Sequence, residues 1–200
     1  MARQPDGIRR QLPNILTILR FAAVPVFAAL FVSAGSDAAV AAGLFFAGAA
    51  ATDQIDGWLA RRWHVESRFG RIADPLADRV MISVAAVLLW HEGRLPWPGA
   101  LIVIGRDLLL VLGYQVLAPR GLAIGVTRLG KLGTWVLYAA LTGLIVTDRG
   151  TDWPLWLFWL GLAIALGAAA QYVIAARRGL SALGEEGDRA VARTKTGRSS

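Results

Sequence analysis

Four aspartates are the side chains best suited to chemistry in this sequence. Asp53 and Asp56 stand three residues apart, and Asp74 and Asp78 stand four residues apart. Residues at these spacings share one face of an α-helix, so the sequence predicts two helices that each present two carboxylates. All four lie in or beside apolar stretches, where ionised side chains are rare and usually functional.

A short connector separates the two pairs, so we expect the two helices to pack antiparallel, with the four carboxylates converging. Like charges this close repel one another unless cations neutralise them. An all-oxygen ligand set suits Mg²⁺ or Mn²⁺. Four carboxylates are enough for a two-metal site, which stabilises the attacking and leaving oxygens of a phosphoryl displacement.

Small and basic residues accompany the aspartates. Gly57, Ala60 and Gly70 fall on the same helix faces as the carboxylates, where the missing bulk would let an extended ligand approach the backbone. Arg61 and Arg71 add guanidinium groups suited to phosphate. A single aspartate at a helix end is often a cap, and a single small residue in a membrane helix is often a packing contact. The combination at this spacing favours a phosphate site.

The elements that position these residues are six apolar stretches, each close to the roughly 20 residues that a membrane-spanning helix needs. They cover residues 14–34, 38–63, 72–90, 97–118, 129–146 and 153–176. The sequence therefore predicts an all-α integral membrane protein with six transmembrane helices. Residues 7–12 are expected to form a short interfacial helix. Residues 1–178 would form one membrane domain, and residues 179–200 a polar, disordered cytoplasmic tail.

Composition supports a membrane protein. Of the 200 residues, 56% are hydrophobic and 18% are charged, and there is no cysteine. Too much apolar side chain is present for a disordered chain, and disulfide scaffolds, thiolate metal sites and cysteine nucleophiles are excluded.

The net charge of +7 alone allows either nucleic acid or an anionic membrane surface as the partner. The basic residues gather at the N-terminus, the second and fourth connectors and the tail, while the other side carries only Arg94 and Arg149. This bias predicts a multi-pass protein of the cell (inner) membrane, with both termini and the active site facing the cytoplasm. It disfavours nucleic acid as a partner.

The signature residues resemble a known family. The string Asp53-x-x-Asp56-Gly57-x-x-Ala60-Arg61, followed after eight residues by Gly70 and then by Asp74 and Asp78, is similar to the signature of the CDP-alcohol phosphatidyltransferases. The resemblance implies a core of six membrane helices and a homodimer. It also implies transfer of a phosphatidyl group from CDP-diacylglycerol to an alcohol, with release of CMP.

The resemblance also implies roles for individual residues. The metal ligands would be Asp53, Asp56, Asp74 and Asp78. Asp78 would complete the shell of the second ion and act as the general base that takes the proton of the acceptor hydroxyl. The cytidine and pyrophosphate site would be lined by Gly57, Ala60, Arg61 and Gly70.

The acceptor is expected to be of the glycerol type. Residues 11–20, QLPNILTILR, resemble the N-terminal stretch of both phosphatidylglycerophosphate synthases and CMP-forming cardiolipin synthases. Arg106 followed by Asp107 favours the cardiolipin branch, with phosphatidylglycerol as acceptor; the alternative acceptor is glycerol-3-phosphate. Arg106 and Lys131 are candidates for binding the acceptor phosphate. Their alternative roles are a pair with Asp107 and a positively charged anchor at the membrane surface.

A small ion transporter is the competing class, because intramembrane carboxylates also mark ion pathways. The aspartates cluster at one membrane face, however, and the sequence has no visible repeat symmetry, so the transporter is the less favoured hypothesis.

Overall fold

The computed structural model describes the backbone of residues 7–33, 36–63, 70–117 and 127–196. Side chains are described for residues 18–19, 21–33, 39–52, 79–117 and 127–181. Helices make up nearly all of this part of the chain, in agreement with the all-α prediction. They are α1 (Gly7–Val32), α2 (Ser36–Trp63), α3 (Gly70–His91), α4 (Trp97–Leu117), α5 (Arg128–Val146) and α6 (Trp153–Thr196).

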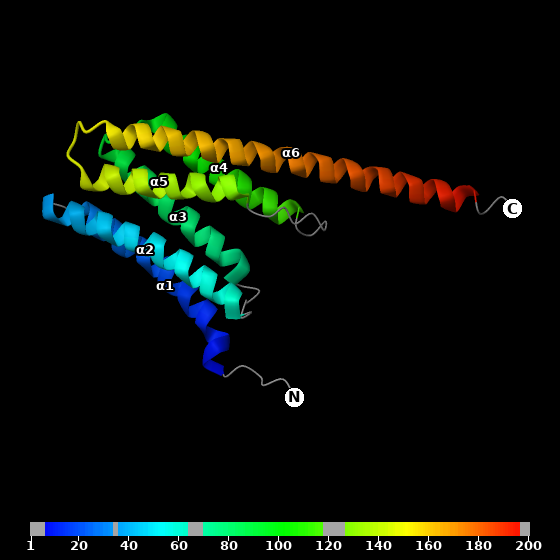
Figure 1. The fold of residues 1–200 in the computed structure, drawn as a ribbon, viewed down its shortest axis with the longest axis horizontal. Helices are drawn as coiled ribbons and strands as arrows, with labels where there is room; N and C mark the ends of the chain where they lie inside the picture. The colour runs from blue at the N-terminus through cyan, green and yellow to red at the C-terminus, as the bar shows by residue number, and fades with distance from the viewer. Residues whose placement is uncertain (1–6, 34–35, 64–69, 118–126, 197–200) are drawn as a thin grey trace.

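Successive helices run in alternating directions, so every second connector lies at the same end of the molecule (Figure 1). The α1–α2, α3–α4 and α5–α6 connectors share one end, and the two chain termini belong to the other. This order is the one that the predicted cytoplasmic placement of both termini requires.

Three helical segments within the described residues are long and apolar enough to cross a membrane: α4, α5 and Trp153–Ser181 of α6. In the other three helices, the described stretches Phe21–Val32, Ala39–Thr52 and Arg79–His91 are apolar but are shorter than a membrane span. The described residues thus support a membrane protein, while six spans remain a prediction.

The core joins the first half of the bundle to the second. Phe27 of α1, Phe46 of α2 and Tyr138 of α5 form a row of rings, with centroids 5.1 Å apart between Phe27 and Phe46 and 5.2 Å apart between Phe46 and Tyr138. Both phenylalanines are fully buried. Tilted ring pairs at this separation stabilise packing beyond the area that they bury. α5 in turn packs closely along α6, and α4 packs on α3 and α6.

At the end of the molecule opposite the termini, an arginine links the α3–α4 connector to the end of α5. Arg94, between α3 and α4, donates hydrogen bonds to the backbone carbonyls of Ile145, at 3.3 Å, and of Thr147 at the C-terminal end of α5. A cation is favourable there because the last carbonyls of a helix carry partial negative charge. Partial burial, assisted by the nearby Arg149, lowers the pKa of Arg94. Arg149 also pairs with Glu92.

Two helix ends differ from the sequence predictions. Residues 7–12 are the first turns of α1 and not a separate interfacial helix; they contain Ile, Arg, Gln and Leu, which allow a helix to continue. α6 runs to Thr196, whereas a disordered tail was expected from residue 179. Residues 179–196 combine the good helix formers Ala, Leu, Glu and Arg with three glycines, which disfavour a helix.

Candidate functional site

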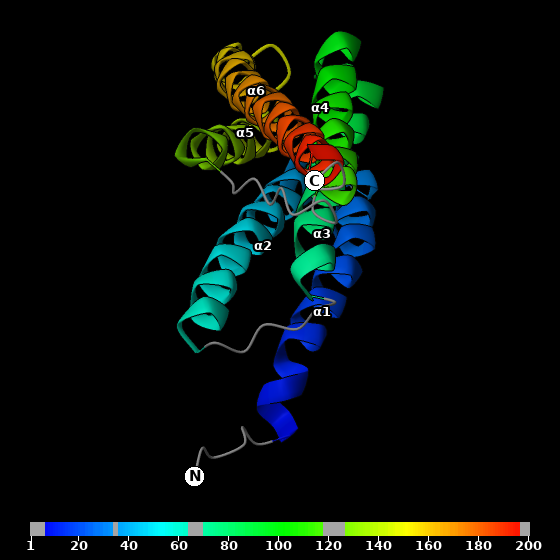
Figure 2. The same cartoon turned by 90° about the vertical axis from the view of Figure 1, so that its right-hand side faces the viewer.

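The signature is divided between two helix ends. Asp53, Asp56, Gly57, Ala60 and Arg61 lie in the C-terminal part of α2. The remaining residues, Gly70, Asp74 and Asp78, lie in the N-terminal part of α3. Both parts are found at the same end of the molecule, together with the N-terminal end of α1 (Figure 2). The side chains of residues 53–78 are outside the described residues, so the convergence of the carboxylates stays a prediction.

The helices carrying the signature are held by shared neighbours. α2 packs on α1 and α5, and α3 packs on α1, α4 and α5. Direct packing of α2 against α3 is not among the main helix contacts of the described residues. α2 and α3 run antiparallel, as expected (Figure 1). In the described part of the chain, however, the two helices are linked by their shared contacts with α1 and α5 more than by contacts with each other. A common support of this kind can fix the two helix ends relative to each other without extensive direct packing.

The donor set fits a hard divalent cation. Both aspartate pairs lie in helical backbone, in which residues at these spacings share one face, and carboxylate oxygens are the ligands that Mg²⁺ and Mn²⁺ prefer. Among the residues whose side chains are described, no group of three or more His, Cys, Asp or Glu could hold a metal. The side chains of the four signature aspartates lie outside that set, and these aspartates stay the predicted metal ligands.

The described region next to the signature contains a buried ionic cluster. Asp107 of α4 accepts hydrogen bonds on one oxygen, Oδ1, from two arginines: Arg79 Nη1 at 2.6 Å and Arg106 Nη1 at 2.5 Å. The side chains of Asp107 and Arg106 are only 4% and 5% exposed, and that of Arg79 is 24% exposed. Arg79 directly follows Asp78 in α3. The cluster therefore ties α4 to the turn of α3 that carries the last signature aspartate.

Two polar atoms of this cluster have no hydrogen-bond partner among the described residues: Arg106 Nε and Asp107 Oδ2. Burying an unsatisfied donor on a cation or an unsatisfied acceptor on a carboxylate is costly. Unsatisfied groups of this kind in a native protein call for a specific explanation. Here one donor and one acceptor each keep a hydrogen-bonding capacity that no described residue uses.

The two candidates for binding the acceptor phosphate differ in placement. Arg106 is buried and paired with Asp107, which is the alternative role considered for it, although its Nε remains available. Lys131 is exposed in the first turn of α5. That turn is capped by Thr127, whose side chain accepts a hydrogen bond from the Gly130 N–H at 3.1 Å. No contact between Lys131 and Arg106 is seen among the described residues.

Arg79 is the site residue that sequence reasoning missed. In the sequence, Arg79 is one of several positive charges near the second connector. The position of Arg79 could have indicated its role. The residue directly follows a signature aspartate at the start of an apolar segment, and a guanidinium buried there needs an anion as partner. The partner, Asp107, lies 28 residues away, so no local spacing could identify it.

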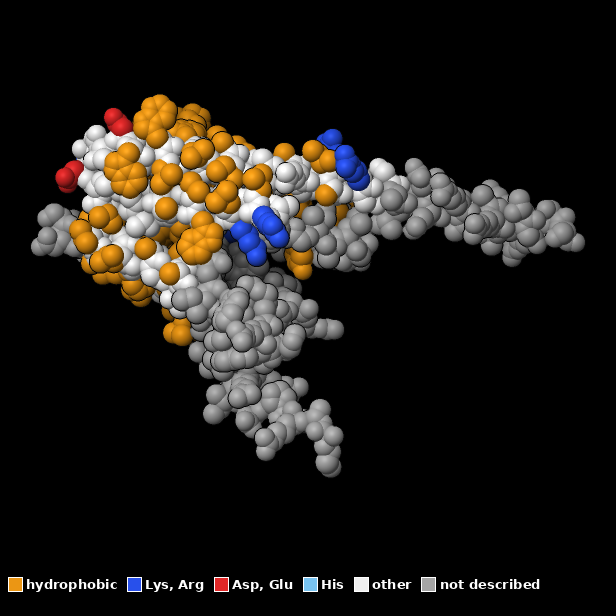
Figure 3. Space-filling view, in the orientation of Figure 1, with side chains coloured by type: hydrophobic (Ala, Val, Ile, Leu, Met, Phe, Trp, Pro, Cys, Tyr) orange, Lys and Arg blue, Asp and Glu red, His pale blue; other side chains and the backbone are white. Residues whose placement is uncertain are grey.

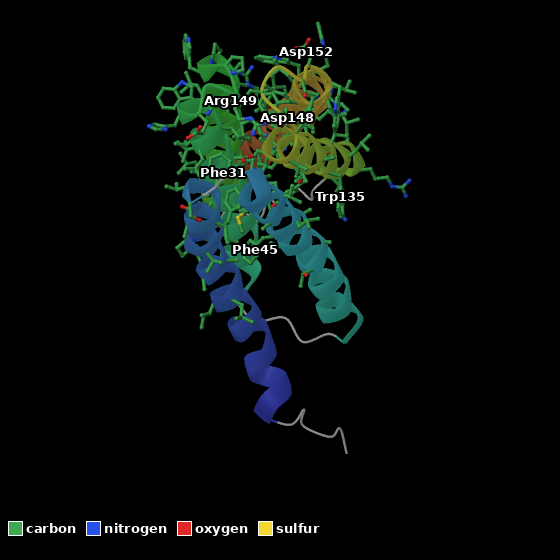
Figure 4. All side chains as sticks on the ribbon, turned by 90° about the vertical axis from the view of Figure 1, so that its left-hand side faces the viewer. Phe31, Phe45, Trp135, Asp148, Arg149 and Asp152 are labelled. Carbon is green, nitrogen blue, oxygen red and sulfur yellow. The ribbon has the colours of Figure 1, made fainter. Side chains whose placement is uncertain are left out.

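Exposed charges divide the described surface into two ends. On the face drawn in Figure 3, Lys and Arg side chains appear near the middle of α6 and at the start of α5, whereas acidic side chains appear at the opposite end. Asp148, Arg149 and Asp152 gather there, in the α5–α6 connector (Figure 4). The basic end is the one that carries the signature. An anionic lipid substrate would be attracted to that end.

Comparisons with known proteins agree with the signature. Residues 10–167 match the family described as CDP-alcohol phosphatidyltransferase. A protein of Escherichia coli (strain K12) named "CDP-diacylglycerol--glycerol-3-phosphate 3-phosphatidyltransferase" is 33% identical over 178 residues, which cover 84% of this chain and 96% of the relative. A protein of the same name from Shigella flexneri serotype 5b (strain 8401) is 32% identical over 181 residues, with the same coverage.

The family match covers most of the chain, including both halves of the aspartate signature, and the relatives align over nearly their whole length. The chain belongs to the CDP-alcohol phosphatidyltransferase family and is an enzyme of that class.

Proposed function

We propose that this enzyme transfers the phosphatidyl group of CDP-diacylglycerol to glycerol-3-phosphate and releases CMP. The observation that carries the proposal is the name shared by relatives that are 32–33% identical over 96% of their own length. This evidence favours the alternative acceptor over phosphatidylglycerol, which the Arg106–Asp107 pair alone had favoured. One residue type at one position is a weaker guide than similarity along the whole chain.

The reaction needs a nucleophile, a base and a neutralised pyrophosphate. A hydroxyl oxygen of the acceptor forms a bond to the phosphorus that carries diacylglycerol, and the bond from that phosphorus to the bridging oxygen breaks, leaving CMP. Asp78 takes the hydroxyl proton. Asp53, Asp56 and Asp74, with Asp78, would hold Mg²⁺ or Mn²⁺, which when bound offsets negative charge on the phosphates.

Neutral and basic residues would bind and orient the substrates. Gly57, Ala60 and Gly70 leave room for the cytidine and pyrophosphate, and Arg61 supplies a guanidinium for phosphate oxygens. Arg106 and Lys131 are the candidates for the acceptor phosphate, and of the two Arg106 has the support of an available buried donor.

The setting of the site is part of the proposal. The basic end of the molecule faces the cytoplasm, all six helices cross the inner membrane, and the enzyme acts as a homodimer. The water-soluble acceptor would then reach the site from the cytoplasm, and the lipid substrate from the membrane.

A direct assay tests the acceptor. Purified enzyme in detergent is given CDP-diacylglycerol and Mg²⁺ with glycerol-3-phosphate, with phosphatidylglycerol, or with no acceptor, and CMP and the lipid product are measured. We expect CMP and phosphatidylglycerophosphate with glycerol-3-phosphate only. Cardiolipin formed from phosphatidylglycerol, without turnover of glycerol-3-phosphate, would contradict the proposed acceptor. EDTA should abolish turnover, and excess Mg²⁺ or Mn²⁺ should restore it.

A further inference from the structure

The buried cluster of Arg79, Asp107 and Arg106 suggests a role for a carboxylate that lies outside the aspartate signature. We propose that Asp107 is a positioning residue, which orients the Arg106 guanidinium for the phosphate of the acceptor and ties it to α3 through Arg79. The inference rests on the proposed function, because it assumes a phosphate-bearing acceptor.

The hydrogen bonds define the orientation. Both arginines donate to the same oxygen of Asp107, at 2.6 Å and 2.5 Å, and charge-assisted bonds of this length are among the stronger ones in proteins. Because one carboxylate oxygen serves both guanidiniums, a shift of Asp107 would disturb both. Arg79 comes from α3 and the other two residues come from α4, so the cluster also fixes the two helices relative to each other.

The unused atoms indicate what the cluster is oriented for. Arg106 uses Nη1 toward Asp107, while its buried Nε has no partner among the described residues. A guanidinium has five N–H donors in a planar fork, so Arg106 can be held on one side and still donate to an anion on another. Phosphate oxygens match that fork. A cluster with only a structural role would be expected to satisfy its buried donors internally.

The location connects the cluster with the reaction. Arg79 is adjacent in sequence to Asp78, which takes the proton from the acceptor hydroxyl in the proposed mechanism. If Arg106 binds the phosphate of the acceptor, the acceptor is held by the Arg79–Asp107–Arg106 cluster. The same cluster is attached to α3 through Arg79, next to the base Asp78. Orientation of the reacting hydroxyl relative to the base is a large contribution to catalysis in such a step.

The test separates positioning from general stability. Asp107→Asn keeps the shape of the side chain and removes its charge. We expect it to raise KM for glycerol-3-phosphate about tenfold, the effect of weakening one hydrogen bond to a charged group. KM for CDP-diacylglycerol should change little. Asp107→Glu, which restores the carboxylate, should recover most of the loss. Asp152→Asn, the same change at an exposed position at the opposite end, is the control and should leave both KM values unchanged.

A double-mutant cycle asks whether Asp107 acts through Arg106. Arg106→Gln and the double variant Arg106→Gln/Asp107→Asn should have similar KM values for the acceptor, because Asp107 has nothing left to orient. If the KM increase of the double variant equals the product of the increases of the two single variants, the inference is overturned. An unchanged acceptor KM in Asp107→Asn would also overturn it. If that variant does not fold, Asp107→Glu and Arg79→Lys are measured instead. An acceptor KM that stays at the wild-type value in both would likewise overturn it.

The outcome is distinguishable from failure of the proposed function. If wild-type enzyme turns over phosphatidylglycerol and not glycerol-3-phosphate, the proposed acceptor is wrong. The same cycle is then run with phosphatidylglycerol, which also carries a phosphate, and a selective rise of its KM would still support the positioning role of Asp107.

Discussion

At the scale of single residues, Asp78 is the position where the chemistry should be most sensitive. Asp78→Asn preserves size but removes both the proton acceptor and a negative charge facing the metal site. Loss of a general base typically lowers the rate by about 10²–10⁴-fold, and the weakened metal site adds to this, so CMP release should fall to background. Size-exclusion profile and thermal unfolding in detergent should remain those of the wild type.

The matched control for Asp78 is Asp148→Asn, the same substitution in the exposed α5–α6 connector, which should retain wild-type turnover. Normal CMP release by a folded Asp78→Asn variant would remove Asp78 from the role of base. The sequence alone sufficed to single out this residue, because its spacing from Asp74 is local. It did not suffice for Arg79, whose role depends on a partner in another helix.

At the scale of the elements, the close approach of α5 and α6 depends on glycine. A Cβ added to Gly133 would lie 2.9 Å from the backbone nitrogen of Ala165 and 3.0 Å from its Cα, and backbone atoms cannot move aside without shifting the helix. We expect Gly133→Ala to destabilise the protein by up to about 2 kcal/mol, because an overpacking cost of about 1–3 kcal/mol is offset by a helix-propensity gain of only about 1 kcal/mol.

The control for Gly133 lies on the same helix pair. A Cβ at Gly167 would meet only the Leu129 side chain, at 3.7 Å, which is an ordinary contact. Gly167→Ala should therefore unfold at or slightly above the wild-type temperature, and Gly133→Ala below it. Equal unfolding temperatures for the two variants would show that the α5–α6 separation is not set by Gly133.

The existence of all six helices could be predicted from the sequence, whereas some of their ends could not. Apolar stretches mark the membrane segments because burial in lipid depends on side-chain hydropathy. Hydropathy says little about a polar helix, so the extension of α6 to Thr196 and the continuity of α1 from Gly7 were missed. The neighbours of α2 and α3 were also missed, because a short connector predicts proximity but not which third helix lies against both.

At the scale of the whole molecule, the basic side chains gather at the same end of the helical bundle as the signature. One end carries the signature and the basic residues Arg128, Lys131, Arg177 and Arg178, and the other carries Asp148 and Asp152 together with Arg149. Sequence could predict this asymmetry because it requires only the order of the helices and their connectors. Contacts such as Arg79–Asp107 could not be predicted in the same way, since they depend on how far each helix is rotated about its axis.

The charge asymmetry predicts the orientation of the protein in the membrane. Excess Lys and Arg remain on the cytoplasmic side, so the end with Ser181 should face the cytoplasm and the α5–α6 connector the opposite side. The chain has no cysteine, so Ser181→Cys and Asp148→Cys each introduce a unique thiol at an exposed position. A membrane-impermeant maleimide added to spheroplasts should label Asp148→Cys at once and Ser181→Cys only after permeabilisation. The reverse pattern would place the carboxylates and their soluble acceptor on opposite sides of the membrane, and so contradict a cytoplasmic active site.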